Sequence, residues 1–185
     1  GSYGFPESHA QSFARLVYVS AWIKCHHPAV FAAALLNSQP MGFYAPAQIV
    51  RDAREHDVEV MPVDVNASNW DNGLEKRQDT GLALRLGFRQ ISGFREEWAH
   101  TISAARTEGR FTSIEDMARR ARLPQRALRL LADGDTCGSL RLDRRVALWE
   151  VRRMPDDELP LFAAARAAEL GKEPNISLRP MGLGE

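Results

Sequence analysis

The chain has 185 residues, 44% of them hydrophobic, which is enough for one or two domains with a core of their own. No apolar stretch approaches the length of a membrane span, and the N-terminus lacks the charged-then-apolar pattern of a secretory signal. We therefore expect no membrane partner and a cytoplasmic location. Cys25 and Cys137 lie far apart and belong to no CxxC pair, which argues against a zinc site. Gly1-Ser2 is typical of a cloning remnant.

The formal net charge of zero hides an uneven distribution of charges. Residues 1–80 carry 6 basic against 9 acidic side chains, residues 81–153 carry 15 against 9, and residues 154–185 carry 3 against 6. All 15 cations of the middle segment are arginine, whose fixed charge and forked donors suit phosphate groups. This segment, at about +6, is the predicted nucleic-acid contact. The alternative is a set of ordinary solvated helix faces in which arginine replaces lysine.

A first helix is predicted from Ser8, because Ser8 followed by Gln11 is a capping-box pattern. Apolar side chains then recur at helical spacing and give the helix one apolar stripe. These side chains are Phe13, Leu16, Val17 and Ala21.

Two further helices are predicted before residue 58. Pro28 would end the first helix and occupy the first position of a second, which runs through Asn37. A third helix would open at Pro46 and end near residue 56. Its inward residues would be Ile49, Val50 and Ala53.

Residues 58–86 are predicted to form a short β-containing connection. Residues 58–65 alternate with period two, as in a strand with one buried face, and Pro62 within them favours an edge strand or a break. Residues 69–80 are polar and carry a turn signal at Asn72-Gly73. Residues 80–86 alternate again, so we expect a second strand that pairs with the first.

Residues 91–99 have the pattern of a helix-hairpin-helix motif, in which a short helix ends at an apolar-x-Gly turn and a second helix follows at once. Gly93 would let the backbone approach a phosphate closely, and the free amides of the second helix would face the anion. Ala99 and Ile102 would pack the second helix onto the first. The residues predicted to contact DNA here are Arg89, Ser92, Gly93, Phe94 and Arg95.

The charges around this turn leave a second interpretation open. Arg95 occupies the place of the second glycine that the motif usually has, which reduces access to the backbone but supplies a cation. Glu96 and Glu97 suit a helix N-terminus, yet they would repel a phosphate. The turn is therefore either a weakened DNA contact or purely architectural.

A second unit of the same kind is predicted from Leu123 through Gly134 to Arg144, with Arg145 and Trp149 on its last helix. Between the two units, residues 111–116 have the pattern of a capped helix start. Paired hairpins of this kind hold the backbone of duplex DNA without reading base edges. The predicted contacts in the second unit are Gly134, Arg144 and Arg145. The alternative is a small helical packing domain.

No constellation of side chains in the chain predicts catalysis or metal binding. His26 and His27 point about 100° apart on a helix, so they make a poor pair for one ion. Ser8 and His9 are not a nucleophile and base, because neighbouring side chains diverge and no third group orients the histidine. The scattered acids Asp64, Asp71 and Asp79 are interpreted as loop residues.

The segment from Tyr3 to Ala10, continued by Trp22 to Pro28, resembles the end of the fingers in the bacterial C-family DNA polymerases, the DNA polymerase III alpha-subunit family. Glu7 stands where the replicative branch usually has lysine, so the nearer resemblance is to the error-prone branch used in damage-induced, translesion synthesis. Ser8 and His9 belong to this fingers motif. Residues 130–140 are similar to the family's second hairpin, and the resemblance covers roughly residues 3–162.

The resemblance implies a mainly α fold with a small β element. Residues 3–57 would end the fingers, 58–86 would connect, 87–153 would form a tandem helix-hairpin-helix domain, and 154–185 would be a linker. The family's chemistry needs clustered aspartates that hold Mg²⁺ in the palm, upstream of Tyr3. This chain alone is therefore expected to have no cofactor and no polymerase activity, and to bind duplex DNA without sequence preference.

The linker offers an opposing function. Glu158–Phe162 is similar to the peptide by which bacterial polymerases dock on the sliding clamp, with Leu159, Leu161 and Phe162 as the apolar contacts. Under this alternative the chain is a protein-interaction module for the clamp or accessory translesion proteins, and its hairpins are only structural. A helix that packs on the domain is the other interpretation of this segment.

Overall fold

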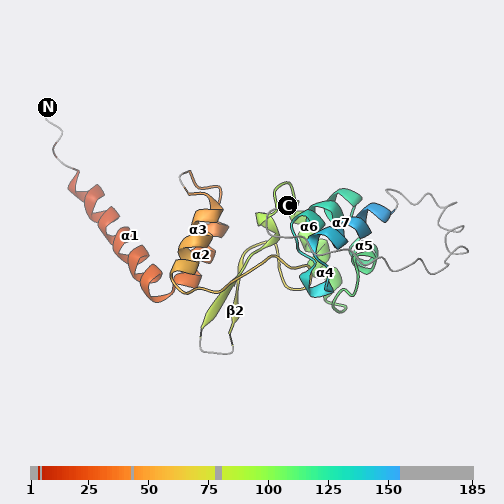
Figure 1. The fold of residues 1–185 in the computed structure, drawn as a ribbon. Coiled ribbons are helices and arrows are strands. Elements are labelled where there is room, and N and C mark those ends of the chain that lie inside the picture. Colours follow the sequence, from red (N-terminus) through yellow and green to blue (C-terminus); the bar gives the residue numbers. More distant parts are fainter. Residues whose placement is uncertain (1–3, 5, 43, 78–80, 155–185) are drawn as a thin grey trace, which may run out of the picture. The chain divides into compact units, whose positions relative to one another are not determined.

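The computed structural model describes residues 4, 6–42, 44–77 and 81–154, and the chain divides into two compact units (Figure 1). The first unit consists of Gly1–Pro62 with Asp71–Gly87, and the second of Val63–Trp70 with Phe88–Glu185. The fold is mainly helical with one small sheet, as the sequence predicts. Residues 58–86, predicted as one connection, are shared between the units, because residues 63–70 lie in the second.

In the first unit, α2 (Pro28–Asn37) and α3 (Pro46–Glu55) begin and end close to where the sequence predicts. Each begins with proline, whose fixed φ suits the first helical position. The small side chains of α2 let α3 and the sheet approach closely, and Val50 packs at the edge of the resulting core. This core consists of Ala29, Ala32, Ala33, Leu36, Ile49, Ala53, Val58 and Leu84.

The first helix, α1 (Glu7–His26), differs from the prediction in two respects. It begins one residue earlier, after Pro6, and no side chain caps it, so the capping box expected at Ser8 does not form. The apolar stripe of residues 13–21 is exposed, and none of the residues of α1 is buried. The last turn is held to α3 by an ion pair of 2.8 Å between Lys24 and Asp52.

The sheet has three short strands, β1 (Val60–Met61), β2 (Gly73–Lys76) and β3 (Leu82–Arg85), in the order β1-β3-β2. β3 pairs with β1 in parallel and with β2 antiparallel. The second predicted strand is confirmed, and it pairs with the first as expected. The first is shorter than predicted because it ends before Pro62, which cannot donate to a ladder. β2 lies in the polar segment that the sequence analysis assigned to turns.

Asn72 is buried and holds the sheet to α2. Its Nδ2 donates to Oδ1 of Asn37 at 2.7 Å, and its backbone N donates to the same oxygen at 2.8 Å. Its own Oδ1 accepts a hydrogen bond from Gly87 N at 3.0 Å. The turn signal at Asn72-Gly73 therefore marks the start of β2, and the asparagine side chain fixes it there.

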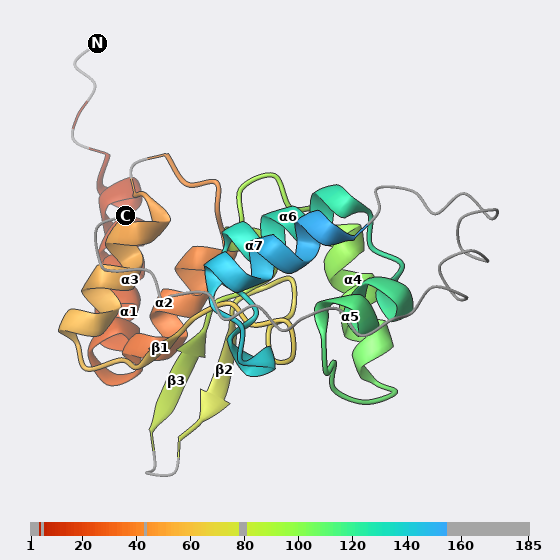
Figure 2. The ribbon, with the colours of Figure 1, turned by 45° about the vertical axis from the view of Figure 1, so that its right-hand side comes forward.

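The second unit is helical. Its elements are η1 (Phe88–Gln90), α4 (Glu96–Arg106), α5 (Ile114–Ala121), α6 (Gln125–Asp133), η2 (Gly138–Leu140) and α7 (Arg144–Arg153). α6 and α7 lie side by side and antiparallel, because Gln125 Nε2 at the start of α6 donates to the carbonyl oxygen of Val151 near the end of α7 (Figure 2). The largest fully buried side chains of this unit include Phe88, Ile102, Ile114, Met117, Leu131 and Val151.

Two findings concern the whole of the described chain. None of its described helices combines the length and the apolarity that crossing a membrane requires. Within the same residues, no group of three or more His, Cys, Asp and Glu side chains is placed to hold a metal ion.

Candidate nucleic-acid interface

Residues 63–70 connect both predicted hairpins of the second unit. Asp64 closes a turn on itself, since its Oδ1 accepts a hydrogen bond from Asn66 N at 2.8 Å and its backbone N donates to Ser68 Oγ at 3.0 Å. Its Oδ2 accepts a hydrogen bond from Ser139 N at 2.9 Å, and Val65 N donates to the carbonyl oxygen of Thr136 at 3.0 Å. Asp64 is therefore a loop residue, as predicted, that fixes the second hairpin.

The buried side chain of Asn66 joins two further segments. Its Oδ1 accepts a hydrogen bond from Phe111 N at 2.8 Å, and its Nδ2 donates to the carbonyl oxygen of Phe111 at 3.0 Å. The same Nδ2 donates to Ser139 Oγ at 3.0 Å. One amide thus fixes the loop before α5 against η2.

Arg106, in the last turn of α4, serves the fold. Its Nη1 donates to the carbonyl oxygens of Ser68 at 2.7 Å and Val65 at 3.2 Å, and its Nη2 donates to Asn69 Oδ1 at 2.6 Å. Burial lowers the pKa of Arg106, while the charge of Asp64 opposes this shift. With its guanidinium occupied by these acceptors, Arg106 is not available to a phosphate.

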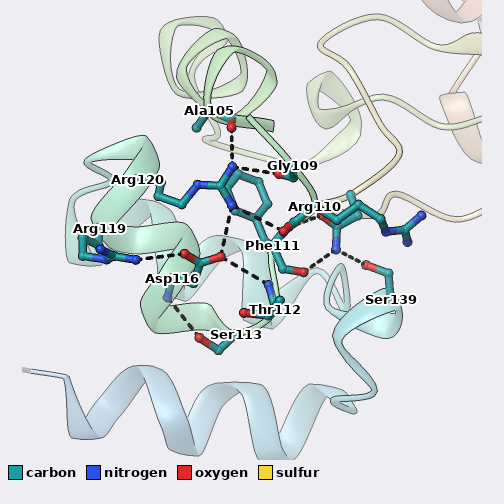
Figure 3. Close-up of polar contacts among 11 residues, drawn as sticks. Ala105, Gly109, Arg110, Phe111, Thr112, Ser113, Asp116, Arg119, Arg120 and Ser139 are labelled. Carbon is teal, nitrogen blue, oxygen red and sulfur yellow. Dashed lines mark hydrogen bonds and ion pairs between the residues drawn. The ribbon is translucent and has the colours of Figure 1, made fainter. Parts of the chain in front are cut away.

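A second structural arginine, Arg120 of α5, holds the end of α4 and the loop that follows it (Figure 3). Its Nη2 donates to the carbonyl oxygens of Ala105 and Gly109, its Nη1 lies 3.1 Å from an oxygen of Asp116, and its guanidinium lies over the ring of Phe111. Asp116 also pairs with Arg119 at 3.2 Å. The predicted capped start of α5 is confirmed, because Ser113 Oγ accepts a hydrogen bond from Asp116 N at 3.0 Å.

The first hairpin is a tight turn between η1 and α4. Phe94 N donates to the carbonyl oxygen of Ile91 at 3.1 Å, and Gly93 has a φ of +78°, which side chains other than glycine rarely adopt. Ser92 and Gly93 are exposed, and α4 begins at Glu96, so its first amides have no partner within the helix. The first helix of this hairpin is a single 3₁₀ turn. Ala99 and Ile102 are fully buried, as predicted.

The side chains around this turn limit how it can meet an anion. Phe94 is buried against Phe88 and Trp98, with ring centroids 5.5 and 5.4 Å apart, so it supports the turn from inside. Arg95 is exposed, but it pairs with Glu97 at 3.1 Å and lies 5.2 Å above the ring of Trp98. A phosphate at this turn would have to displace a carboxylate from Arg95.

The second hairpin packs directly on the first. An added Cβ at Gly134 would lie 3.2 Å from the carbonyl oxygen of Leu130 and 3.5 Å from Ile91 Cδ1, so the absence of a side chain allows this approach. Thr136 and Cys137 then turn inward, and burial raises the pKa of Cys137 to about 12, which keeps this thiol protonated. Because the φ of Gly134 is −79°, the glycine is needed for this close packing and not for its backbone conformation.

The link between α6 and α7 is longer than a hairpin turn, because residues 134–143 include η2. Asp143 caps α7, with Oδ1 accepting a hydrogen bond from Val146 N at 2.8 Å. Arg144 faces Asp133, with 3.5 Å between Nη2 and Oδ1. Arg145 is exposed and pairs with no carboxylate among the described residues. Of the two predicted arginines, Arg145 is the one available to a phosphate.

Other exposed arginines of this unit make no ion pair with a described carboxylate, and none of them is among the residues predicted to contact DNA. They are Arg110, Arg122, Arg126, Arg129, Arg141 and Arg152. Two of them, Arg126 and Arg129, lie three residues apart on one side of α6. A usable sequence signal was the lack of an acidic residue three or four positions from Arg126 or Arg145, since such neighbours pair on a helix.

The remaining predicted positions comprise one in the second unit, two in the first and three outside the described residues. Arg89 is half-buried and its backbone N donates to the carbonyl oxygen of Trp70 at 3.1 Å. Ser8 and His9 lie on the exposed start of α1, where the ring of His9 contacts that of Phe13 with centroids 4.4 Å apart. Leu159, Leu161 and Phe162 lie outside the described residues, so docking on a clamp stays a prediction.

Comparison with known proteins shows which family model and which polymerases the chain is similar to. The family described as the helix-hairpin-helix motif matches residues 57–147, which include the sheet, the first hairpin and the second as far as the first turn of α7. The chain is 66% identical over its whole length to the error-prone DNA polymerase of Brucella abortus, and 57% identical over its whole length to that of Rhodopseudomonas palustris. It is 57% identical over 99% of its length to the error-prone DNA polymerase of Ruegeria pomeroyi.

The second unit is therefore a helix-hairpin-helix domain. The chain spans about 17% of the length of these curated relatives. Over its whole length the chain is similar to one segment of these error-prone DNA polymerases, as the resemblance of residues 3–162 predicts.

Proposed function

We propose that this segment binds the phosphate backbone of duplex DNA, without reading its sequence, within an error-prone polymerase that copies damaged templates. The observation that carries the proposal is the turn of residues 91–95, where an exposed glycine with positive φ leads directly into the start of α4, with the amides of Glu96 and Glu97 ahead of the first backbone hydrogen bond of the helix, from Trp98 N to the carbonyl oxygen of Arg95. Backbone amides and arginine reach phosphates and not base edges, so the contact would be indifferent to sequence.

The charge of the second unit supports the same function. Its described residues carry 14 arginines against ten carboxylates, so this unit is about +4 in a chain with no net charge. The arginines that lack a carboxylate partner lie mainly on α6, α7 and the link between them. We propose that the catalytic metal ions are held in the palm of the parent polymerase, because the chemistry of that family needs clustered aspartates.

Salt dependence tests the proposal. Fluorescence anisotropy of two labelled duplexes of unrelated sequence should give equal affinities that fall steeply with salt, because each neutralised phosphate releases counterions. Arg95→Ala and Arg145→Ala should each weaken both duplexes equally and reduce the slope of log K against log salt by about 0.9.

Arg119→Ala is the matched control, because Arg119 is exposed and pairs with Asp116 as Arg95 pairs with Glu97, but it lies on α5 and outside the turn of residues 91–95. It should leave affinity and slope unchanged. Absence of binding at low salt, or binding that does not respond to salt, would show that the hairpins only support the fold.

A further inference from the structure

α7 directs an aromatic and cationic face away from the core. Ala147 and Val151 are buried, and Trp149 lies on the opposite side of the helix with 42% of its surface exposed. Arg145 and Arg152 stand four residues before and three after Trp149, so all three side chains share this face. The packing of α7 on α6 therefore leaves a large aromatic ring between two cations.

Trp149 differs from the tryptophan of the first hairpin. Trp98 is half-buried and its ring is already packed against Phe94 and the guanidinium of Arg95. Among the described residues, no aromatic ring and no guanidinium stacks on Trp149, and neither Arg145 nor Arg152 pairs with a carboxylate. Its ring is thus available to a flat partner.

We propose that Trp149, Arg145 and Arg152 form a stacking site for unpaired nucleotides, so that the domain prefers duplex DNA with a single-stranded extension. A base offers its π-face only when it is unpaired and unstacked, whereas a duplex presents backbone and base edges. An aromatic ring flanked by cations suits both parts of a nucleotide, the base and the phosphate. The preference for a junction rests on the proposed duplex contact, but the stacking site itself does not.

Titration of the ¹⁵N-labelled chain by NMR tests the site. The indole Nε1–H signal of Trp149, assigned by its loss in Trp149→Phe, should shift further with an oligothymidylate than with a blunt duplex, whose phosphates reach only the neighbouring Arg145. In anisotropy measurements, Trp149→Ala should weaken binding to a tailed duplex by about fivefold or more. A fivefold change is the lower end of the range of affinity lost when one base–aromatic stack is removed. Binding to a blunt duplex should change less than twofold, and Trp149→Phe should retain most of the preference.

The controls separate this inference from the duplex contact. Trp22→Ala, which removes an exposed tryptophan of α1, should change neither affinity. Equal affinity of the unaltered chain for tailed and blunt duplexes would overturn the stacking site and leave the duplex contact intact. If the unaltered chain bound the tailed duplex but not the blunt one, only the duplex contact would be overturned. An equal shift of the Trp149 signal with polyglutamate would show an acidic-protein surface instead.

Discussion

Asn66 illustrates how single polar side chains determine this fold. Its amide makes three hydrogen bonds that join residues 63–70 to the loop before α5 and to η2. Asp64 adds a bond to the backbone of the second hairpin. Because these groups are buried, removal of one partner would leave the other without a hydrogen bond either to the protein or to water. The relative placement of the hairpins therefore depends on a few polar residues as well as on apolar packing.

Asn66→Ala is expected to lower the free energy of unfolding of the second unit by roughly 2–4 kcal/mol, because it leaves the backbone N and O of Phe111 buried without their partner. Chemical denaturation followed by circular dichroism measures the change. Thr101→Ala is the matched control, since Thr101 is exposed and bonds only within α4, and it should stay within about 0.5 kcal/mol. Equal effects of the two variants would contradict the structural role of Asn66.

Glu150 gives a prediction about pH. Burial on α7 raises the pKa of Glu150, although Arg153 opposes the shift. The folded state therefore binds the proton more tightly than the unfolded state, and the stability associated with this group is present at acid pH and lost as pH rises through the folded pKa.

Glu150→Gln should consequently raise the midpoint of thermal unfolding at neutral pH and change it little below the usual pKa of a glutamate. Glu108→Gln, at an exposed position beyond α4, should show no such difference between the two pH values. A variant of Glu150 that destabilises the protein at neutral pH would show that the carboxylate makes a favourable interaction.

At the scale of elements, the two hairpins offer different chemistry to a phosphate. The first hairpin has a short exposed turn, but its Arg95 is paired with Glu97. Two acidic residues, Glu96 and Glu97, also begin its second helix, α4. The second has a long link whose helix is capped by Asp143, and its contribution comes from side chains such as Arg145. The glycine of each hairpin also differs, since Gly93 is needed for its φ and Gly134 for close packing.

Elements with local signals could be predicted from the sequence. Proline at the first helical position marked α2 and α3, and Ser113 marked α5. The turn at Gly93 could likewise be predicted, because it requires a positive φ that glycine adopts readily and other residues rarely do. In each of these cases, a few neighbouring residues determine the structure.

Elements that depend on distant partners could not be predicted. Residues 63–65 continue the alternation of a strand, yet they are held in the second unit by Thr136 and Ser139, which lie more than 70 positions away. β2 is polar and forms because β3 pairs with it. Which arginines are available to DNA depends in the same way on tertiary neighbours, as Arg106 and Arg120 show.

At the scale of the whole molecule, each unit has a core of its own although the chain passes between them three times. Leu36 is fully buried in the core of the first unit and Ile102 in that of the second. The arginine excess and both hairpins belong to the second unit alone. We therefore expect the first unit to be dispensable for the affinity of the isolated chain for DNA.

Leu36→Ala and Ile102→Ala remove side chains of equal size, one from each core. Each should lower the free energy of unfolding by about 2–5 kcal/mol, because both leave a cavity in a fully buried site. Hydrogen exchange measured by NMR should be accelerated in α2, α3 and the sheet by Leu36→Ala, and in α4–α7 by Ile102→Ala, since local stability follows the core that is damaged. Only Ile102→Ala should weaken duplex binding, and each variant is the control for the other. If Leu36→Ala reduced protection in α4–α7 to the same extent, the two cores would unfold as one cooperative unit, and DNA binding would depend on the stability of both.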